Sequence, residues 1–171
     1  RTLGAAHAFD LGRLANEHAP RLRLVDARGD RLEAVEFHPA WHELMARSMA
    51  AGMHSSTWDA QPEPSAHVAR AARLYMTTQV EAGHVCPITM THASLAVLRQ
   101  APDLIRRWAP LIASRRYDPA FRPWWEKQSV TIGMGMTERQ GGTDVRANTT
   151  RATPHGAHYR IDGQKWFMSA P

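Results

Sequence analysis

The stretch that most constrains the fold covers residues 129–144 and contains four glycines. Along its first half, apolar residues alternate with small polar residues or glycine; the apolar positions are Val130, Ile132, Met134 and Met136. This period of two predicts a β-strand over 129–136 with one buried face. Glycine at two successive positions of the other face leaves room for a flat ligand against the backbone.

The second half of this stretch has the residues of an anion-binding loop. Thr137 is followed by Gly141-Gly142 and then by Thr143, so hydroxyl and backbone N–H donors are close together in the sequence. Such a loop can direct its donors at a polar, anionic ligand. Taken alone, the pattern fits an ordinary hairpin equally well.

A second informative segment is residues 159–169, Tyr-Arg-Ile-Asp-Gly-Gln-Lys-Trp-Phe-Met-Ser. Asp162-Gly163 is a strong hairpin dipeptide, so this segment predicts two strands that turn at that point.

Together the two segments carry a family resemblance. Met-Thr-Glu-x-x-Gly-Gly-Thr-Asp (136–144), followed by Gly-x-Lys-x-Phe-x-Ser (163–169), resembles the flavin-binding β-domain of the acyl-CoA dehydrogenases. Other segments resemble the AidB branch of that superfamily and extend the likeness over nearly the whole chain: Leu11–Asn16, Phe37–His42, Gln79–Gly83 and Cys86–Thr91.

The resemblance implies an FAD site. Thr137 would contact the flavin, Ser169 matches a hydroxyl residue near N5, and Phe167 takes the place of an aromatic residue that packs on the ring. Thr143 matches a small hydroxyl residue that meets phosphate or substrate. Donors near N1, O2 and N5 favour the reduced ring, which is the chemistry such residues serve. The full set of expected FAD contacts is Met134, Met136, Thr137, Gly142, Thr143, Phe167, Met168 and Ser169. The alternative is that the hydroxyls satisfy strand ends and Phe167 is core.

The order of elements, helices first and strands last, predicts an α+β fold. We expect an N-terminal helical domain over 1–126 with a small β-hairpin near 21–37. Residues 127–171 would be the opening strands of a mainly antiparallel β-domain of acyl-CoA dehydrogenase type. A C-terminal helical domain, as the family has, would not be present in this chain.

The clearest predicted helix follows Ser65 and ends at Gly83. Its apolar stripe is predicted to face the core and comprises Val68, Ala72, Tyr75, Met76 and Gln79. Further helices are predicted over 3–17 and 39–51, from Pro87 to about Gln100, and from Asp103 onward.

The resemblance implies FAD-dependent α,β-dehydrogenation of an acyl-CoA thioester. The alternative is an AidB-type flavoprotein that binds DNA and protects it from alkylation, with dehydrogenase activity vestigial. Arg139 stands where most acyl-CoA dehydrogenases have proline, which puts an ordinary β-oxidation substrate in doubt. Because the family's carboxylate base lies in its C-terminal domain, no catalytic residue is assigned and this segment alone is expected to be inactive. A homo-oligomer, tetrameric by resemblance, and DNA contact through the C-terminal part are further expectations.

Charge composition bears on whether the chain binds phosphate groups. The net charge is +5, with only two lysines among the 21 basic residues. An arginine cluster over residues 106–122 is either a solvated surface or a phosphate contact.

The pairs His38/His42 and His155/His158 lack a third ligand at fixed spacing, so no metal site is predicted. One cysteine, Cys86, excludes an internal disulfide, fits a cytoplasmic protein and is expected to pack as a small apolar residue. No apolar run approaches the roughly 20 residues of a membrane span.

Overall fold

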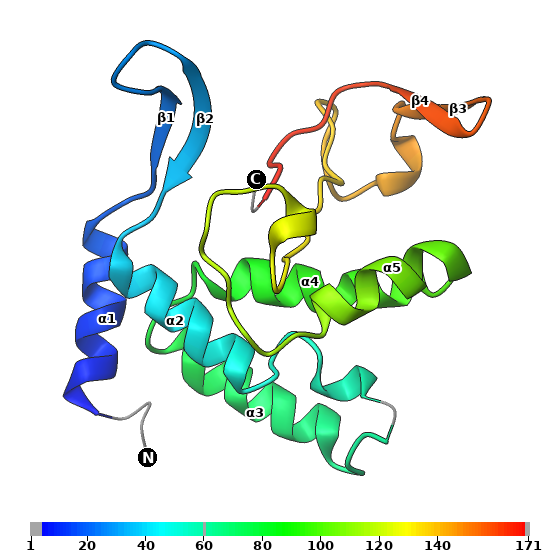
Figure 1. The fold of residues 1–171 in the computed structure, drawn as a ribbon. Coiled ribbons are helices and arrows are strands. Elements are labelled where there is room, and N and C mark those ends of the chain that lie inside the picture. Colours follow the sequence, from blue (N-terminus) through cyan, green and yellow to red (C-terminus); the bar gives the residue numbers. More distant parts are fainter. Residues whose placement is uncertain (1–4, 60, 170–171) are drawn as a thin grey trace. The chain divides into compact units, whose positions relative to one another are not determined.

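The computed structural model describes residues 5–59 and 61–169 and divides into two compact units, Arg1–Ile132 and Gly133–Pro171. The first unit is mainly helical and the second contains a small antiparallel sheet (Figure 1). The predicted α+β order is therefore confirmed. None of the helices in the described residues has the length and apolar character needed to cross a membrane.

Over residues 5–59 and 61–132, the helical unit contains five α-helices: α1 (Ala6–Glu17), α2 (Pro39–Ala50), α3 (Ala66–Thr78), α4 (Val85–Leu98) and α5 (Pro102–Ile112). Local signals explain several of their ends. Pro39 occupies the first turn of α2, and the His38 side chain accepts a hydrogen bond from Ala40 N at 3.2 Å. Proline suits a first turn because its missing N–H would have no intrahelical partner there.

The core of this unit forms where α2 crosses its neighbours. Met45, Met49, Met53 and Ile88 make one buried cluster, covered by Trp41, Leu74 and Tyr117. A second cluster joins α1 to α2 through Leu11, Ala40 and Leu44. Methionine-rich packing suits this crossing, since a flexible thioether fills irregular gaps.

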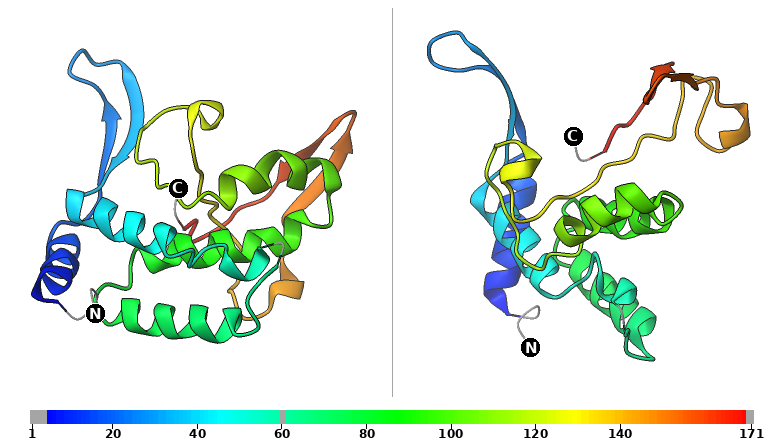
Figure 2. Two further views of the ribbon diagram at one scale, coloured as in Figure 1. Left: turned by 60° about the horizontal axis from the view of Figure 1, so that its bottom comes forward. Right: turned by 45° about the vertical axis from the view of Figure 1, so that its right-hand side comes forward.

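The predicted hairpin near residues 21–37 is confirmed. Strand β1 (Arg21–Val25) pairs antiparallel with β2 (Arg31–Glu36), and the turn between them contains Gly29 at φ 90°. The hairpin projects beyond the helices of its own unit (Figure 2). Every residue of β1 is exposed.

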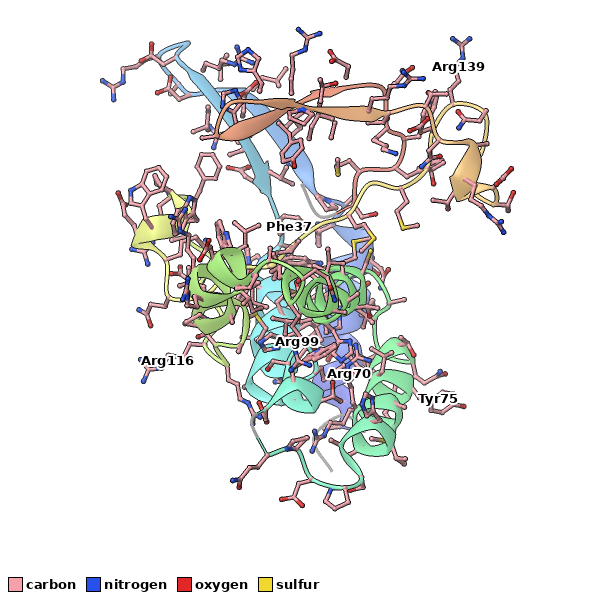
Figure 3. The ribbon with its side chains drawn as sticks, turned by 90° about the vertical axis from the view of Figure 1, so that its right-hand side faces the viewer. Phe37, Arg70, Tyr75, Arg99, Arg116 and Arg139 are labelled. Carbon is pink, nitrogen blue, oxygen red and sulfur yellow. The ribbon has the colours of Figure 1, made fainter. Side chains whose placement is uncertain are left out.

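The orientation of α3 differs from the prediction. Its whole apolar stripe is exposed, with Val68 at 73% and Tyr75 at 71%, and Tyr75 extends away from the helix (Figure 3). The opposite face packs instead. Arg70 Nε donates to Met53 O at 2.7 Å, and Thr77 is buried. Arginine stems supply apolar surface and their heads satisfy carbonyls after α2, so the basic face can pack as well as an apolar one.

Cys86 is exposed, so the expectation of a packed cysteine is wrong. It lies between buried Val85 and Pro87 in the first turn of α4. Successive helical positions are rotated by about 100°, so a residue between two buried ones can still face solvent.

The second unit contains β3 (Arg151–His155) and β4 (His158–Asp162), paired antiparallel. The hairpin turn lies at Gly156-Ala157, so the turn predicted at Asp162-Gly163 is wrong. Gly163 has another role: a Cβ there would lie 2.2 Å from Thr150 Oγ1, and its φ is 157°. The glycine permits this close approach at the strand end. Residues 165–169 are extended without being a strand.

The strand predicted over residues 129–136 is also not formed. Val130 N donates to Leu111 O, and Ile132 N donates to Thr91 Oγ1 at 3.0 Å, so these amides serve no β-ladder. The expected burial alternation fails too, because Ser129 is buried and Met136 is exposed. A strand requires a paired neighbour, and none of the described residues pairs with this segment.

Candidate functional site

The motif residues of the second unit are organised around one buried carboxylate, that of Glu138, which is 3% exposed. Its Oε2 accepts from Thr149 N at 2.6 Å, Thr149 Oγ1 at 3.0 Å and Gln140 Nε2 at 3.3 Å. Its Oε1 accepts from Thr150 N at 3.0 Å and Lys165 Nζ at 2.9 Å. Five donors therefore converge on one side chain, far more than a surface glutamate makes.

These donors fix the charge state of Glu138. The donors of Thr150 and Thr149, together with the Lys165 ammonium, hold the pKa of the Glu138 carboxyl well below its usual range. Hydrogen bonds to the ionised form favour that form. The lowered pKa favours the ionised form near neutral pH, and both carboxylate oxygens are already occupied by donors of the unit. Glu138 is therefore a structural anchor of this unit.

Two carbonyls beside Glu138 tie the remaining segments to it. Met136 O accepts from Asn148 Nδ2 at 2.9 Å and from Lys165 Nζ at 3.2 Å. Thr137 O accepts from Trp166 N at 2.9 Å. Residues 136–138 are therefore bonded both to the entry of β3 and to the segment 165–169.

Two of the glycines in the first motif allow close contacts within this unit. A Cβ on Gly142 would lie 2.8 Å from Thr137 Oγ1, and one on Gly135 would lie 2.9 Å from Met168 Cε. A Cβ at Gly142 would push the Thr137 hydroxyl away, and one at Gly135 would displace the end of the flexible Met168 side chain, since real Cβ atoms do not approach so closely. The sequence motif thus brings Thr137 to Gly142 and Met168 to Gly135.

Other predicted contacts face solvent. The loop 139–147 is exposed throughout, including Thr143, and Arg139 points away from it (Figure 3). Phe167 is 80% exposed and adopts φ 54°, a conformation rare for a bulky residue. Ser169 Oγ makes one long bond, 3.4 Å to Phe167 O. Met134 is half-buried and Met136 exposed. Phe167 is therefore not a core residue of the described structure.

Sequence reasoning missed Glu138, Lys165 and Asn148 as structural members of this site. A signal existed for the first two. The second motif contains one charged residue, Lys165, and the first contains two acids, Glu138 and Asp144, either of which could pair with it. Opposite charges in two segments expected to adjoin could have predicted the pair.

The helical unit contains a separate buried polar chain. Ser48 Oγ lies 2.9 Å from His84 Nε2, and His84 Nδ1 lies 2.7 Å from Glu81 Oε2. Glu81 also accepts from the backbone N–H groups of Gly83 and His84. Burial alone would raise the pKa of Glu81, but the hydrogen bonds from His84 and Gly83 outweigh it and lower the pKa. Although the order Ser–His–Glu matches a hydrolase relay, all three side chains are buried.

Histidines flagged by spacing have other contacts. His38 caps α2 and stacks on His18 with ring centroids 4.5 Å apart, while His42 Nδ1 lies 2.7 Å from Tyr117 OH. The rings of His155 and His158 lie 5.0 Å apart across the β3–β4 turn. Within residues 5–59 and 61–169, no three His, Cys, Asp or Glu side chains are grouped to hold a metal.

Comparison with known proteins gives the family. The model of the adaptive response protein AidB N-terminal domain matches residues 1–119. The chain belongs to the AidB family. It is 47% identical to the putative acyl-CoA dehydrogenase AidB of Escherichia coli over 171 residues, which are 99% of this chain and 32% of that protein. It is 28% identical over 172 residues to acyl-CoA dehydrogenase family member 11 of Caenorhabditis elegans, covering 94% and 26% of the two chains.

Solved structures agree with this membership of the AidB family. The apo form of Bd2924 superposes with a TM-score of 0.80 at 27% identity, over 99% of this chain and 34% of that one. Caenorhabditis elegans ACDH-11 in complex with C11-CoA gives a TM-score of 0.71 at 26% identity, over 94% and 27%. The acyl-CoA dehydrogenase type of fold is thereby confirmed. The chain spans about a third of the length of the relatives it matches.

Proposed function

We propose that this chain supplies part of an FAD site in an oxidoreductase that dehydrogenates an acyl-CoA thioester. The observation that carries the proposal is the bonding of the two motifs through Glu138, Lys165, Thr137 and Trp166. It brings the loop that would meet the cofactor's polar parts into the same unit as the segment that would meet its ring. The names of two relatives as acyl-CoA dehydrogenases support the reaction class, and the C11-CoA complex of ACDH-11 supports the substrate class.

The residues present fit a flavin. An isoalloxazine ring needs an apolar surface together with hydrogen-bond donors, and this unit offers both. Its exposed apolar side chains include Met136, Phe167 and Met168, and Thr137 and Ser169 supply hydroxyls beside them. A bound flavin would supply the hydride acceptor. The chain's part is to place hydroxyl donors where negative charge gathers on reduction, and to cover the ring with Phe167 and Met168.

The two buried acids, Glu138 and Glu81, do not suit the role of the base that removes the α-proton. Glu138 is enclosed and held ionised by its five donors, and Glu81 is buried and bonded to His84. We therefore assign no catalytic residue and expect no turnover by residues 1–171 alone.

The first prediction concerns the cofactor. Full-length protein is expected to purify with, or bind on reconstitution, one FAD with the absorption spectrum of a protein-bound flavin. Ser169→Ala should weaken binding of oxidised FAD by up to about tenfold, because one hydrogen bond to the neutral oxidised ring is worth about 0.5–1.5 kcal/mol. Thr153→Val removes an exposed hydroxyl from β3 and should leave the affinity unchanged. Flavin titrations followed by fluorescence measure both; failure of the wild type to bind FAD would refute the proposed function.

A DNA-binding role is the second candidate, and exposed arginines favour it. Arg107 and Arg116 make no ion pair with described residues, whereas Arg106 and Arg122 are paired with Asp103 and Asp118. Unpaired guanidinium groups on a surface can contact phosphates without reading sequence.

The second prediction tests this role with the 171-residue chain. We expect weak binding to duplex DNA without sequence preference. If about six phosphates are neutralised, affinity should fall roughly a thousandfold between about 50 and 200 mM salt. Gel-shift titrations at the two salt concentrations measure this, with Arg107→Ala/Arg116→Ala as the variant and Arg106→Ala as the control. Tight, salt-resistant binding would instead indicate a specific DNA site in this chain.

A further inference from the structure

Lys165 is the side chain that joins the two motifs most directly. Its Nζ donates to Glu138 Oε1 at 2.9 Å and to Met136 O at 3.2 Å, so it bonds to both ends of the Met-Thr-Glu triplet. Its side chain is 25% exposed and that of its partner 2%. Shielding from solvent makes such a pair stronger than an open surface ion pair, which is worth at most about 1 kcal/mol.

Few other contacts hold the segment that contains Lys165. Among the described residues, Trp166 N bonds to Thr137 O, and the Met168 side chain lies against Gly135. Phe167 is exposed and Ser169 bonds only to Phe167 O. The course of residues 165–169 past the first motif therefore depends on one backbone hydrogen bond, one apolar contact and the Lys165 side chain.

Glu138 keeps its place without Lys165. Four of its five hydrogen bonds come from Gln140, Thr149 and Thr150, all on the other side of the β3–β4 hairpin in the sequence. Removing the lysine would leave the loop attached to the entry of β3 and would release mainly the segment 165–169. The effect of Lys165 is thereby separable from the folding of the sheet.

We propose that Lys165 is a positioning residue that fixes the ring-contact segment, Phe167 to Ser169, relative to Thr137. Lys165 bonds to Glu138 and Met136. Its effect on the flavin is indirect, because it sets the position of the segment that would contact the ring. This inference rests on the proposed FAD site and predicts that Lys165 controls the orientation of the bound ring as well as its affinity.

The chain offers a matched control because Lys127 is its only other lysine. Lys127 Nζ donates to Ala120 O at 2.6 Å in the helical unit, with no acid involved. In full-length protein, Lys165→Met should raise the Kd for FAD about tenfold and change the visible circular dichroism of the residual bound flavin. Lys165→Arg, which keeps the charge and the donors, should restore most of both properties. Lys127→Met should match the wild type.

A second readout needs no flavin. Amide hydrogen exchange in apo-protein should show faster exchange at Trp166 in Lys165→Met, while Thr149 and Thr150 keep their protection, because their bonds to Glu138 remain. If the wild type binds no FAD, the proposed function fails, yet Trp166 exchange still decides whether Lys165 holds its segment. Unchanged Trp166 exchange, or an unchanged flavin dichroism and affinity in Lys165→Met, would overturn the inference. Loss of protection throughout β3 and β4 would also overturn it, since Lys165 would then support the whole unit.

Discussion

Glu81→Ala is expected to lower the free energy of unfolding of the helical unit by about 2–6 kcal/mol, because it leaves the two buried donors of His84 without their acceptor at about 1–3 kcal/mol each. Glu81 is 5% exposed and its partner His84 is fully buried. The substitution removes the acceptor for His84 Nδ1 and for the N–H groups of Gly83 and His84. Each buried donor left unsatisfied costs about 1–3 kcal/mol, so this short turn before α4 has the most to lose.

A conservative variant and a pH series separate charge from geometry. Glu81→Gln keeps one acceptor oxygen and should cost roughly half as much as Glu81→Ala. The folded-state pKa of Glu81 is lowered, so its stabilising contribution is present above the unfolded pKa of about 4.3 and is lost as pH falls through the lower folded value. The gap in stability between the wild type and Glu81→Gln should therefore narrow below about pH 4.

Denaturant unfolding followed by circular dichroism measures these differences. Glu63→Ala is the control, since Glu63 is an exposed glutamate of the same unit and should change stability by less than about 0.5 kcal/mol. If Glu81→Ala unfolded at the same denaturant concentration as Glu63→Ala, the Ser48–His84–Glu81 chain would not contribute to stability.

The positions of the helices could be predicted from the sequence because punctuating residues mark them. Pro39 opens α2, as predicted, and a break between α3 and α4 is found near Gly83. Its bounds differ from the prediction, because α3 already ends at Thr78 and α4 starts at Val85, two residues before Pro87. The packed face of α3 could not be predicted. Helical periodicity defines two faces, but it does not say which one meets the core when one has Val68 and Tyr75 and the other has Arg70 and Thr77. On the packed face, Leu74 contacts the Met45–Ile88 cluster and Arg70 donates to Met53 O. Both contacts depend on the tertiary structure around α2.

The same limit applies to the candidate site. The motif residues were found from the sequence, but the strand expected at 129–136 depends on a partner that periodicity cannot supply. The hairpin turn was assigned to Asp162-Gly163 on dipeptide preference, although Gly156-Ala157 lies between the paired strands. Gly163 is needed instead for its approach to Thr150. A glycine required by close packing and one required by a turn look alike in a single sequence.

Gly12→Ala is the other substitution with a large expected effect. Whether it raises or lowers stability shows how closely α1 packs on Val80. In an open helix position, alanine stabilises by about 1 kcal/mol relative to glycine. In α1, however, a Cβ on Gly12 would lie 2.2 Å from Val80 O and 3.2 Å from Val80 Cγ1. Backbone oxygen cannot swing aside as a side chain can, so α1 must move away from the chain beyond α3.

That movement would disturb the cluster that attaches α1. Leu11, Ala40 and Leu44 are buried together there, with Leu14 and Val80 packed against them. Overpacking costs about 1–3 kcal/mol, and a clash with a backbone oxygen belongs at the upper end of that range. After the propensity gain of roughly 1 kcal/mol is subtracted, we expect a net loss of about 2 kcal/mol. Phe9→Ala on the exposed face of α1 should cost no more than about 0.5 kcal/mol. Denaturant unfolding of the three proteins decides the matter: a Gly12→Ala chain more stable than the wild type would show that α1 does not pack closely on Val80.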